Sequence, residues 1–126
     1  KWHRILTILM VVCIVWHVVV YFKDFREYQR NVESIVFENI ELSDVEDGTY
    51  VGEYDAGYIY AKVEVMIEDG RIVSINLMEH RNERGKTAEV IVDNVVATQK
   101  IDVDAVSGAT NSSNVIKKAI ENAVTQ

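Results

Sequence analysis

A seven-residue segment near the carboxyl end of the chain, residues 104–110 (DAVSGAT), combines residue types that can bind an anion. Gly108 permits a positive φ or a close approach of the backbone to another group. Thr110 stands where the N-cap of a helix belongs, because an apolar helical stripe starts shortly after it. Free backbone amides and the helix dipole at such a position favour an anion such as a phosphate. From spacing alone, the simpler interpretation is an ordinary cap that follows a glycine turn.

Two helices are predicted to flank this segment. The apolar residues after it form one stripe and predict a helix near 111–125: Val115, Ile116, Ala119, Ile120, Ala123 and Val124. Those before it also fall at helical spacing and predict a helix near 87–98: Ala88, Ile91, Val92, Val95 and Val96. Because this second set is rich in β-branched side chains, a strand is the alternative for it.

Alternating apolar and polar residues earlier in the chain predict three strands, Thr49–Tyr54, Tyr58–Glu68 and Ile72–Glu79. Asp69-Gly70 is typical of a tight hairpin turn between the last two. The expected buried faces of these two strands are Ala61, Val63, Val65 and Ile67, and Val73, Ile75 and Leu77. We therefore expect an α+β domain over residues 47–126, with a small antiparallel sheet packed with two helices.

The amino-terminal part of the chain has the composition of a membrane span. Ile5 to Phe22 contains no formal charge, no Gly and no Pro, and as a helix it would be roughly 27 Å long, close to the thickness of a bilayer core. Trp2 and Arg4 flank one end, and Tyr21 and Lys23 mark the other, as is typical of the rims of a span. A cleaved signal peptide fits less well, because no small-x-small cleavage site follows the run.

A stalk and a linker are predicted between this run and the domain. Aromatic and aliphatic residues continue at helical spacing to about Ile35, which predicts an extension of the membrane helix: Phe22, Phe25, Tyr28, Val32 and Ile35 or Val36. This stripe is free to pack on the domain, on a partner helix or on the lipid surface. Asn39 to Asp47 is acidic and irregular. The expected division is a transmembrane anchor over 1–22, a stalk and linker over 23–46, and a domain over 47–126.

The distribution of charge excludes one class of partner. All 20 acidic residues follow the apolar run, whereas two of the 13 basic residues precede it, so the remainder has a net charge near −9. Such a charge argues against nucleic acid as a partner. The single cysteine, Cys13, lies inside the apolar run and excludes a disulfide framework and a Cys-ligated metal site.

The 104–110 segment resembles the D-x-x-[ST]-G-A-T signature of the FMN-binding domain family. That family includes the flavin subunits of Rnf-type and sodium-pumping NADH:quinone reductase complexes, and flavinylated proteins of extracellular electron transfer. Four stretches that together cover about residues 47–124 are similar to the family's opening, central hairpin, approach to the motif and closing helix: DGTYVGEYDAG, VEVMIEDGRIVSINLMEH, ATQKIDVDAVSGAT and SSNVIKKAIENAV.

The resemblance implies a covalent cofactor. In the family, FMN is joined by a phosphoester to the hydroxyl of the motif's last residue, here Thr110, and a flavin transferase of the ApbE type installs it from FAD. Asp104, Ser107, Gly108 and Ala109 would form the recognition and phosphate-binding loop. Flavinylation in the family is extracytoplasmic, which implies a single-pass cell-membrane protein with its amino terminus inside.

The chain departs from many larger family members in the loop after the hairpin. They have a Thr-Pro-Gly-type loop there, whereas this chain contains no Pro and has His80 to Lys86 (HRNERGK) in its place. Gly85 would let the backbone approach a flavin, and Lys86 or Arg84 would stabilise a reduced, anionic flavin. His80 ends a strand beside this loop and is a further candidate contact. The alternative for each is an ordinary solvated loop residue.

The resulting expectation is an electron-transfer flavoprotein rather than a substrate-converting enzyme, since the sequence shows no general acid/base pair, metal cluster or substrate pocket. It would relay electrons between membrane redox partner proteins or the quinone pool and an external acceptor. The alternatives are a non-covalent FMN-binding or sensory module, or an anchoring subunit of a larger membrane complex. Direct reduction of a small molecule ranks third.

Overall fold

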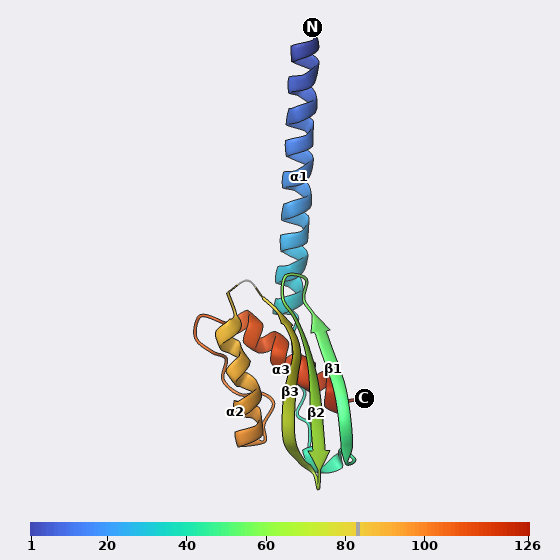
Figure 1. Ribbon diagram of the computed structural model, residues 1–126, viewed down its shortest axis with the longest axis vertical. Coiled ribbons are helices and arrows are strands. Elements are labelled where there is room, and N and C mark those ends of the chain that lie inside the picture. The colour runs from blue at the N-terminus through green and yellow to red at the C-terminus, as the bar shows by residue number, and fades with distance from the viewer. Residues whose placement is uncertain (83) are drawn as a thin grey trace.

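A three-stranded antiparallel sheet packs against two helices at one end of a long amino-terminal helix (Figure 1). The computed structural model describes residues 1–82 and 84–126. The strands lie in the order β1-β2-β3. In chain order the elements are α1 (Trp2–Glu33), the 3₁₀ helix η1 (Leu42–Asp44), β1 (Gly48–Asp55), β2 (Tyr60–Glu68), β3 (Arg71–Arg81), the 3₁₀ helix η2 (Lys86–Val90), α2 (Ile91–Thr98) and α3 (Thr110–Val124). The predicted α+β fold is confirmed.

The hairpin between β2 and β3 forms at the predicted turn. Asp69 and Gly70 both have positive φ, 51° and 70°, as a type I′ turn requires. The inward face of β2 is fully buried at the expected residues, Ala61, Val63, Val65 and Ile67. This face forms the centre of the core, because α3 covers it.

The predicted inward face of β3 is wrong at one position. Val73 is 48% exposed, whereas its neighbour Ile72 is 2% exposed and belongs to the core. Met66 pairs with Ser74 but the next residue, Ile67, pairs with Ile72, so Val73 is the extra residue of a bulge. Because a shift of one residue turns side chains to the opposite face of a sheet, Val73 lies outward.

Helix α3 packs directly on the backbone of β1. A Cβ atom placed on Gly52 would lie 2.2 Å from the carbonyl oxygen of Ala119 and 2.3 Å from the amide nitrogen of Ala123. Only glycine allows this approach, and the two alanines keep the facing side of α3 flat. The predicted helix near 111–125 is confirmed, and its apolar stripe is buried.

The segment before the motif is helical, so the strand alternative for it is wrong. It begins as η2 and continues as α2, with Ala88, Ile91 and Val95 buried. Gln99 ends α2 in the left-handed conformation, with φ of 59°. Its side chain accepts a hydrogen bond from the amide of Ile72 at 2.8 Å and donates one to the carbonyl of Ile72 at 2.9 Å. Gln99 therefore takes the place of a neighbouring strand at the bulge of β3.

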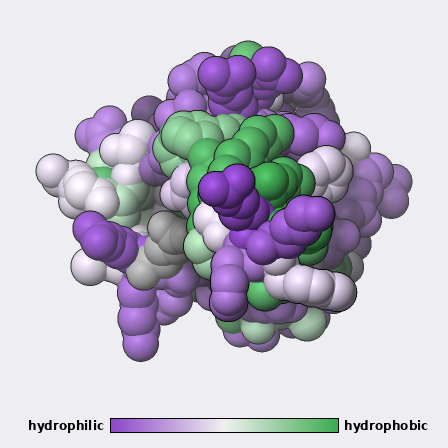
Figure 2. Space-filling view, turned by 90° about the horizontal axis from the view of Figure 1, so that it is seen from above, coloured by the Kyte–Doolittle hydropathy of each residue, from purple (hydrophilic) through white to green (hydrophobic). Residues whose placement is uncertain are grey.

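Helix α1 is continuous through the predicted anchor and most of the predicted stalk. It has the length and apolar composition to cross a membrane, and its residues 2–24 are exposed. Tyr28, Val32 and Ile35 pack on the core, so the stalk contacts the domain. Figure 2, seen from the amino end of α1, shows the apolar residues of α1 gathered above mostly hydrophilic surroundings. The segment after α1 also packs on the core, through Ile40, Leu42 and Val45.

Candidate functional site

The motif forms a tight turn before α3. The amide of Ala109 donates to the carbonyl of Val106 at 2.9 Å, with Ser107 and Gly108 at the centre of the turn. Gly108 has a φ of 80°, the conformation that a type II turn requires at this position. A Cβ atom on Gly108 would meet nothing within 4 Å among the described residues. The backbone angle rather than lack of space therefore favours glycine, as predicted.

Ser113 fastens this turn to the helix. Its hydroxyl donates to the carbonyl of Ala109 at 2.7 Å and accepts from the amide of Val106 at 3.0 Å, and the residue is fully buried. Sequence reasoning did not single out Ser113. The available signal was a serine in the first turn of an apolar helix, where a hydroxyl often bonds the backbone.

Thr110 is the first residue of α3, so its prediction as the N-cap is wrong. Ala109 is the N-cap, because its carbonyl accepts the first helical bond, from the amide of Ser113 at 2.9 Å. The side chain of Thr110 is exposed and makes no hydrogen bond with the described residues. Its hydroxyl is therefore available for chemistry.

The start of α3 has the features that favour binding of an anion. The amides of residues 110–112 precede the first helical donor, the amide of Ser113, and have no partner within the helix. The first turn of α3 contains no acidic side chain, so the partial positive charge of the helix dipole is not neutralised there.

A buried lysine holds the segment that precedes the motif in place through hydrogen bonds. Lys117 is 4% exposed, and its Nζ donates to Oδ1 of Asp102 at 2.9 Å and to the carbonyl of Val103 at 2.8 Å. The same ammonium lies 4.6 Å from the centre of the Phe37 ring. These contacts hold residues 102 and 103, while Asp104 is left exposed at the surface.

A pocket of about 450 Å³ contains Thr110, a volume within the usual range of roughly 300–1,000 Å³ for small-molecule sites. Figure 1 shows that the start of α3, the β1–β2 turn and the carboxyl-terminal part of α1 meet at the same end of the molecule. The lining residues come from α1, the β1–β2 turn, the loop before η2 and the motif: Tyr21, Phe25, Tyr28, Tyr58, Ile59, Arg84, Gly85, Gly108, Ala109, Thr110, Asn111 and Ser112.

The predicted site residues divide between this pocket and its surroundings. Gly85, Gly108, Ala109 and Thr110 line it, as does Arg84, whereas four others do not: His80, Lys86, Asp104 and Ser107. The structure therefore brings the end of the motif together with the loop before η2. Residue 83, within that predicted loop, lies outside the described residues.

Residues 56–125 match the FMN-binding domain, a known protein family. The match covers more than half of the chain, from the β1–β2 turn to the end of α3. The chain belongs to the FMN-binding domain family. No match is found among curated proteins.

The pocket has the groups that FMN requires. The amides at the start of α3 suit the phosphate, Arg84 adds a positive charge to the lining, and aromatic side chains suit the flavin ring. Sequence reasoning missed Tyr21, Phe25 and Tyr58 as lining residues. For the two on α1, the available signal was their spacing of one helical turn.

In this FMN-binding domain, Gly85 brings the loop against α3. A Cβ atom on Gly85 would lie 1.9 Å from Oγ of Ser112, so the glycine permits close contact between two walls of the pocket. The amide of Gly85 also donates to Oδ1 of Asn82 at 2.9 Å. This contact explains the glycine independently of any approach to the flavin.

His80 contacts the loop before η2 on the side away from the pocket that contains Thr110. Its side chain is 2% exposed, and Nδ1 lies 3.2 Å from Oε1 of Glu89 and 3.3 Å from Nδ2 of Asn82. With its proton on Nδ1, the imidazole donates to the Glu89 carboxylate and joins the end of β3 to η2. His80 lines a second hollow with Glu89, separate from the one that contains Thr110.

Proposed function

We propose that this chain is a membrane-anchored, extracytoplasmic flavoprotein that carries FMN as a phosphoester on Thr110 and relays electrons. The observation that carries the proposal is the Thr110 hydroxyl, exposed and unbonded among the described residues, at the anion-binding end of α3 in an FMN-binding domain. A hydroxyl committed to capping the helix would be a poorer acceptor for a phosphoryl group.

The attachment reaction follows from the chemistry of FAD. The oxygen of Thr110 forms a bond to the phosphorus of the FMN half, the bond to AMP breaks, and the hydroxyl proton is released. A flavin transferase of the ApbE type would catalyse this step. The amides at the start of α3 would hold the FMN phosphate. Exposed Asp104 and Ser107 would remain accessible to the transferase as recognition residues.

Membrane anchoring through α1 and covalent attachment of the flavin are consistent with each other. Helix α1 has the length and apolar composition of a span, and with its amino terminus inside, the motif would lie outside the cytoplasm. A flavin there is lost once it dissociates, whereas a covalent bond prevents that loss. The bound flavin would supply the redox chemistry, and the protein would position it and tune it. Membrane redox proteins would be its electron partners.

The second candidate is non-covalent FMN binding in a sensory or anchoring subunit. It is favoured by the pocket itself, whose aromatic wall would hold a flavin without an ester bond. Denaturation separates the two candidates, because only a covalent flavin remains with the unfolded chain.

The test is co-expression of the exported full chain with a flavin transferase, followed by intact-mass measurement and in-gel fluorescence after denaturation. We expect wild type to gain one FMN-yl group and Thr110→Ala to gain none. Thr110→Ser is the matched control, because it keeps a hydroxyl and should retain partial labelling. A folded Thr110→Ala variant that still has covalent flavin would contradict the proposal.

A further inference from the structure

One wall of the pocket that contains Thr110 comes from outside the residues that match the family. Tyr21, Phe25 and Tyr28 of α1 line this pocket, whereas the family match begins at residue 56. The three residues lie on one face of α1, at steps of four and three residues. They span about 10 Å along the helix axis.

The rings of this wall are arranged as a surface for a planar ligand. Tyr21 and Phe25 are nearly parallel, with ring centres 6.3 Å apart and 9° between their planes. Phe25 continues to Tyr28 at 6.3 Å, and Tyr28 meets Tyr58 edge to face at 5.3 Å. Tyr21 is 59% exposed, so much of its ring remains available for contact. Aromatic rings pair favourably with other π-systems at such distances.

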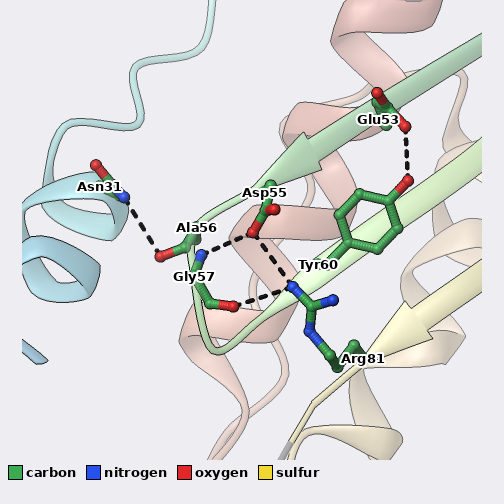
Figure 3. A network of polar contacts seen from close by, with 7 residues as sticks. All are labelled: Asn31, Glu53, Asp55, Ala56, Gly57, Tyr60 and Arg81. Atoms are coloured by element: carbon green, nitrogen blue, oxygen red, sulfur yellow. Dashed lines mark hydrogen bonds and ion pairs between the residues drawn. The ribbon is translucent and has the colours of Figure 1, made fainter. Parts of the chain in front are cut away.

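Polar contacts fix this wall relative to Thr110. Nδ2 of Asn111, the residue after Thr110, donates to the hydroxyl of Tyr28 at 3.1 Å. One turn further along α1, Asn31 Nδ2 donates to the carbonyl of Ala56 at 3.4 Å, as Figure 3 shows. The hydroxyl of Tyr54 donates to the carbonyl of Asn31 at 2.9 Å. The carboxyl-terminal part of α1 is therefore joined both to the start of α3 and to the β1–β2 turn.

The β1–β2 turn is itself held from β3. Nη2 of Arg81 donates to the carbonyl of Gly57 at 3.0 Å and to Oδ1 of Asp55 at 3.4 Å, and Asp55 also accepts from the amide of Gly57 at 2.9 Å (Figure 3). This turn includes Tyr58 and leads to Ile59, two further lining residues. Arg81 of β3 thus holds the turn that contributes Tyr58 to the aromatic wall.

We infer that the anchor helix forms part of the flavin site, with Tyr21 and Phe25 providing the surface on which the isoalloxazine ring packs. Tyr21 is the second-last residue of the uncharged run from Ile5 to Phe22, where aromatic residues mark the boundary between lipid and water. A flavin joined to Thr110 and packed on Tyr21 therefore lies at the membrane surface, facing the bilayer. The inference rests on the proposed attachment at Thr110.

The test uses the flavinylated full chain in lipid nanodiscs and the variants Tyr21→Leu and Phe25→Leu. Phe22→Leu is the matched control, because Phe22 is 56% exposed and lies beside both residues but lines a different groove on α1. A ring stacked on tyrosine has a short fluorescence lifetime, and a free ring has a long one. The amplitude of the short lifetime divided by that of the long lifetime therefore measures how much of the flavin is stacked on the aromatic wall.

We expect Tyr21→Leu and Phe25→Leu each to lower this ratio about two- to twelvefold, which corresponds to about 0.5–1.5 kcal/mol for the loss of an aromatic contact. Phe22→Leu should leave the ratio unchanged. Spin labels on the lipid head groups should quench the wild-type flavin more strongly than labels deep in the acyl chains.

Intact mass, measured on every sample, separates this inference from the proposed function. Samples labelled on Thr110 whose lifetimes do not respond to Tyr21→Leu or Phe25→Leu would overturn the inference and leave the attachment intact. Absence of quenching by head-group labels would overturn the placement at the membrane surface. Wild-type protein with no covalent flavin would overturn both the attachment and the inference.

Discussion

The side chain of Thr110 is exposed and supports neither the turn before it nor the helix that it begins. Ser113, three residues later, does both through its two hydrogen bonds with the motif backbone. The proposed attachment and the local stability therefore depend on different hydroxyls. This division predicts that the two residues respond differently to removal of the hydroxyl.

Thr110→Ala should change the free energy of unfolding by no more than about 0.5 kcal/mol, as is usual for surface substitutions. Ser113→Ala should lower it by about 1–3 kcal/mol, because the amide of Val106 is left without its partner. Urea titration of the full chain in detergent measures both. Equal losses in the two variants would show that Thr110 also caps the helix.

The phenol of Tyr60 is predicted to lose its proton at an unusually high pH, because its pKa is raised. Its hydroxyl donates to Oε2 of Glu53 at 2.6 Å, and this hydrogen bond, with lesser contributions from desolvation and from the charges of Glu53, Glu79 and Asp55, raises its pKa from 10.0 to about 12. Because the folded pKa is raised, the contact stabilises the fold fully below pH 10, and this contribution is lost as the pH rises through about 12.

Ultraviolet absorbance of tyrosinate measures this titration, as the difference between wild type and Tyr60→Phe. The difference curve should have its midpoint at about pH 12. Glu53→Gln should shift the midpoint towards 10, because the neutral amide no longer favours the protonated phenol. A wild-type midpoint at 10 would show that the Glu53 contact is absent in solution.

Among the elements, the contact between α3 and β1 depends on a single position. Gly52→Ala places a methyl group against the backbone of Ala119 and Ala123, which cannot move as a side chain can. We expect the free energy of unfolding to fall by about 1–3 kcal/mol or more. Val51→Ala, on the open face of the same strand, should cost less than about 1 kcal/mol. If Gly52→Ala lowered the free energy of unfolding as little as Val51→Ala does, α3 would have to lie further from the sheet.

The elements themselves were predictable because burial repeats with a local period. Alternation along residues 60–68 and helical spacing along 115–124 record which side chains face the core, and both elements formed as expected. The bulge at Val73 was not predictable in this way. It is stabilised by Gln99, which lies 27 residues from Ile72 in the chain. Periodicity within one strand contains no information about a partner so distant.

The candidate site was predictable only where the chain itself brings its residues together. The turn at Gly108 and the helix that follows are local, and both were expected. The aromatic wall depends on how α1 lies across the domain, so Tyr21 and Phe25 emerge only from the structure. The N-cap was misplaced by one residue because the backbone carbonyl of Ala109, rather than a side chain, begins the helix.

At the scale of the whole molecule, an acidic domain is joined by packing and hydrogen bonds to a long apolar helix. Exposure of residues 2–24 of α1 to water would be costly for a helix of this composition. We therefore expect the full chain to remain in the membrane fraction after alkaline carbonate treatment and to dissolve only in detergent. A variant that begins at Lys23 is the control and should be soluble. Release of the full chain by carbonate alone would contradict the membrane anchor.

The most direct test of the proposed attachment at Thr110 is to locate the flavin on the chain. Trypsin cleaves after Lys100 and Lys117 and releases residues 101–117, a peptide that contains Ser107, Thr110 and two further serines, Ser112 and Ser113. Tandem mass spectrometry of this peptide, from wild-type protein matured with a flavin transferase, assigns the modified oxygen. The proposed attachment predicts one FMN-yl group on Thr110 and none on the serines. A group on any of these serines, or an unmodified peptide from protein that retains flavin after denaturation, would contradict it.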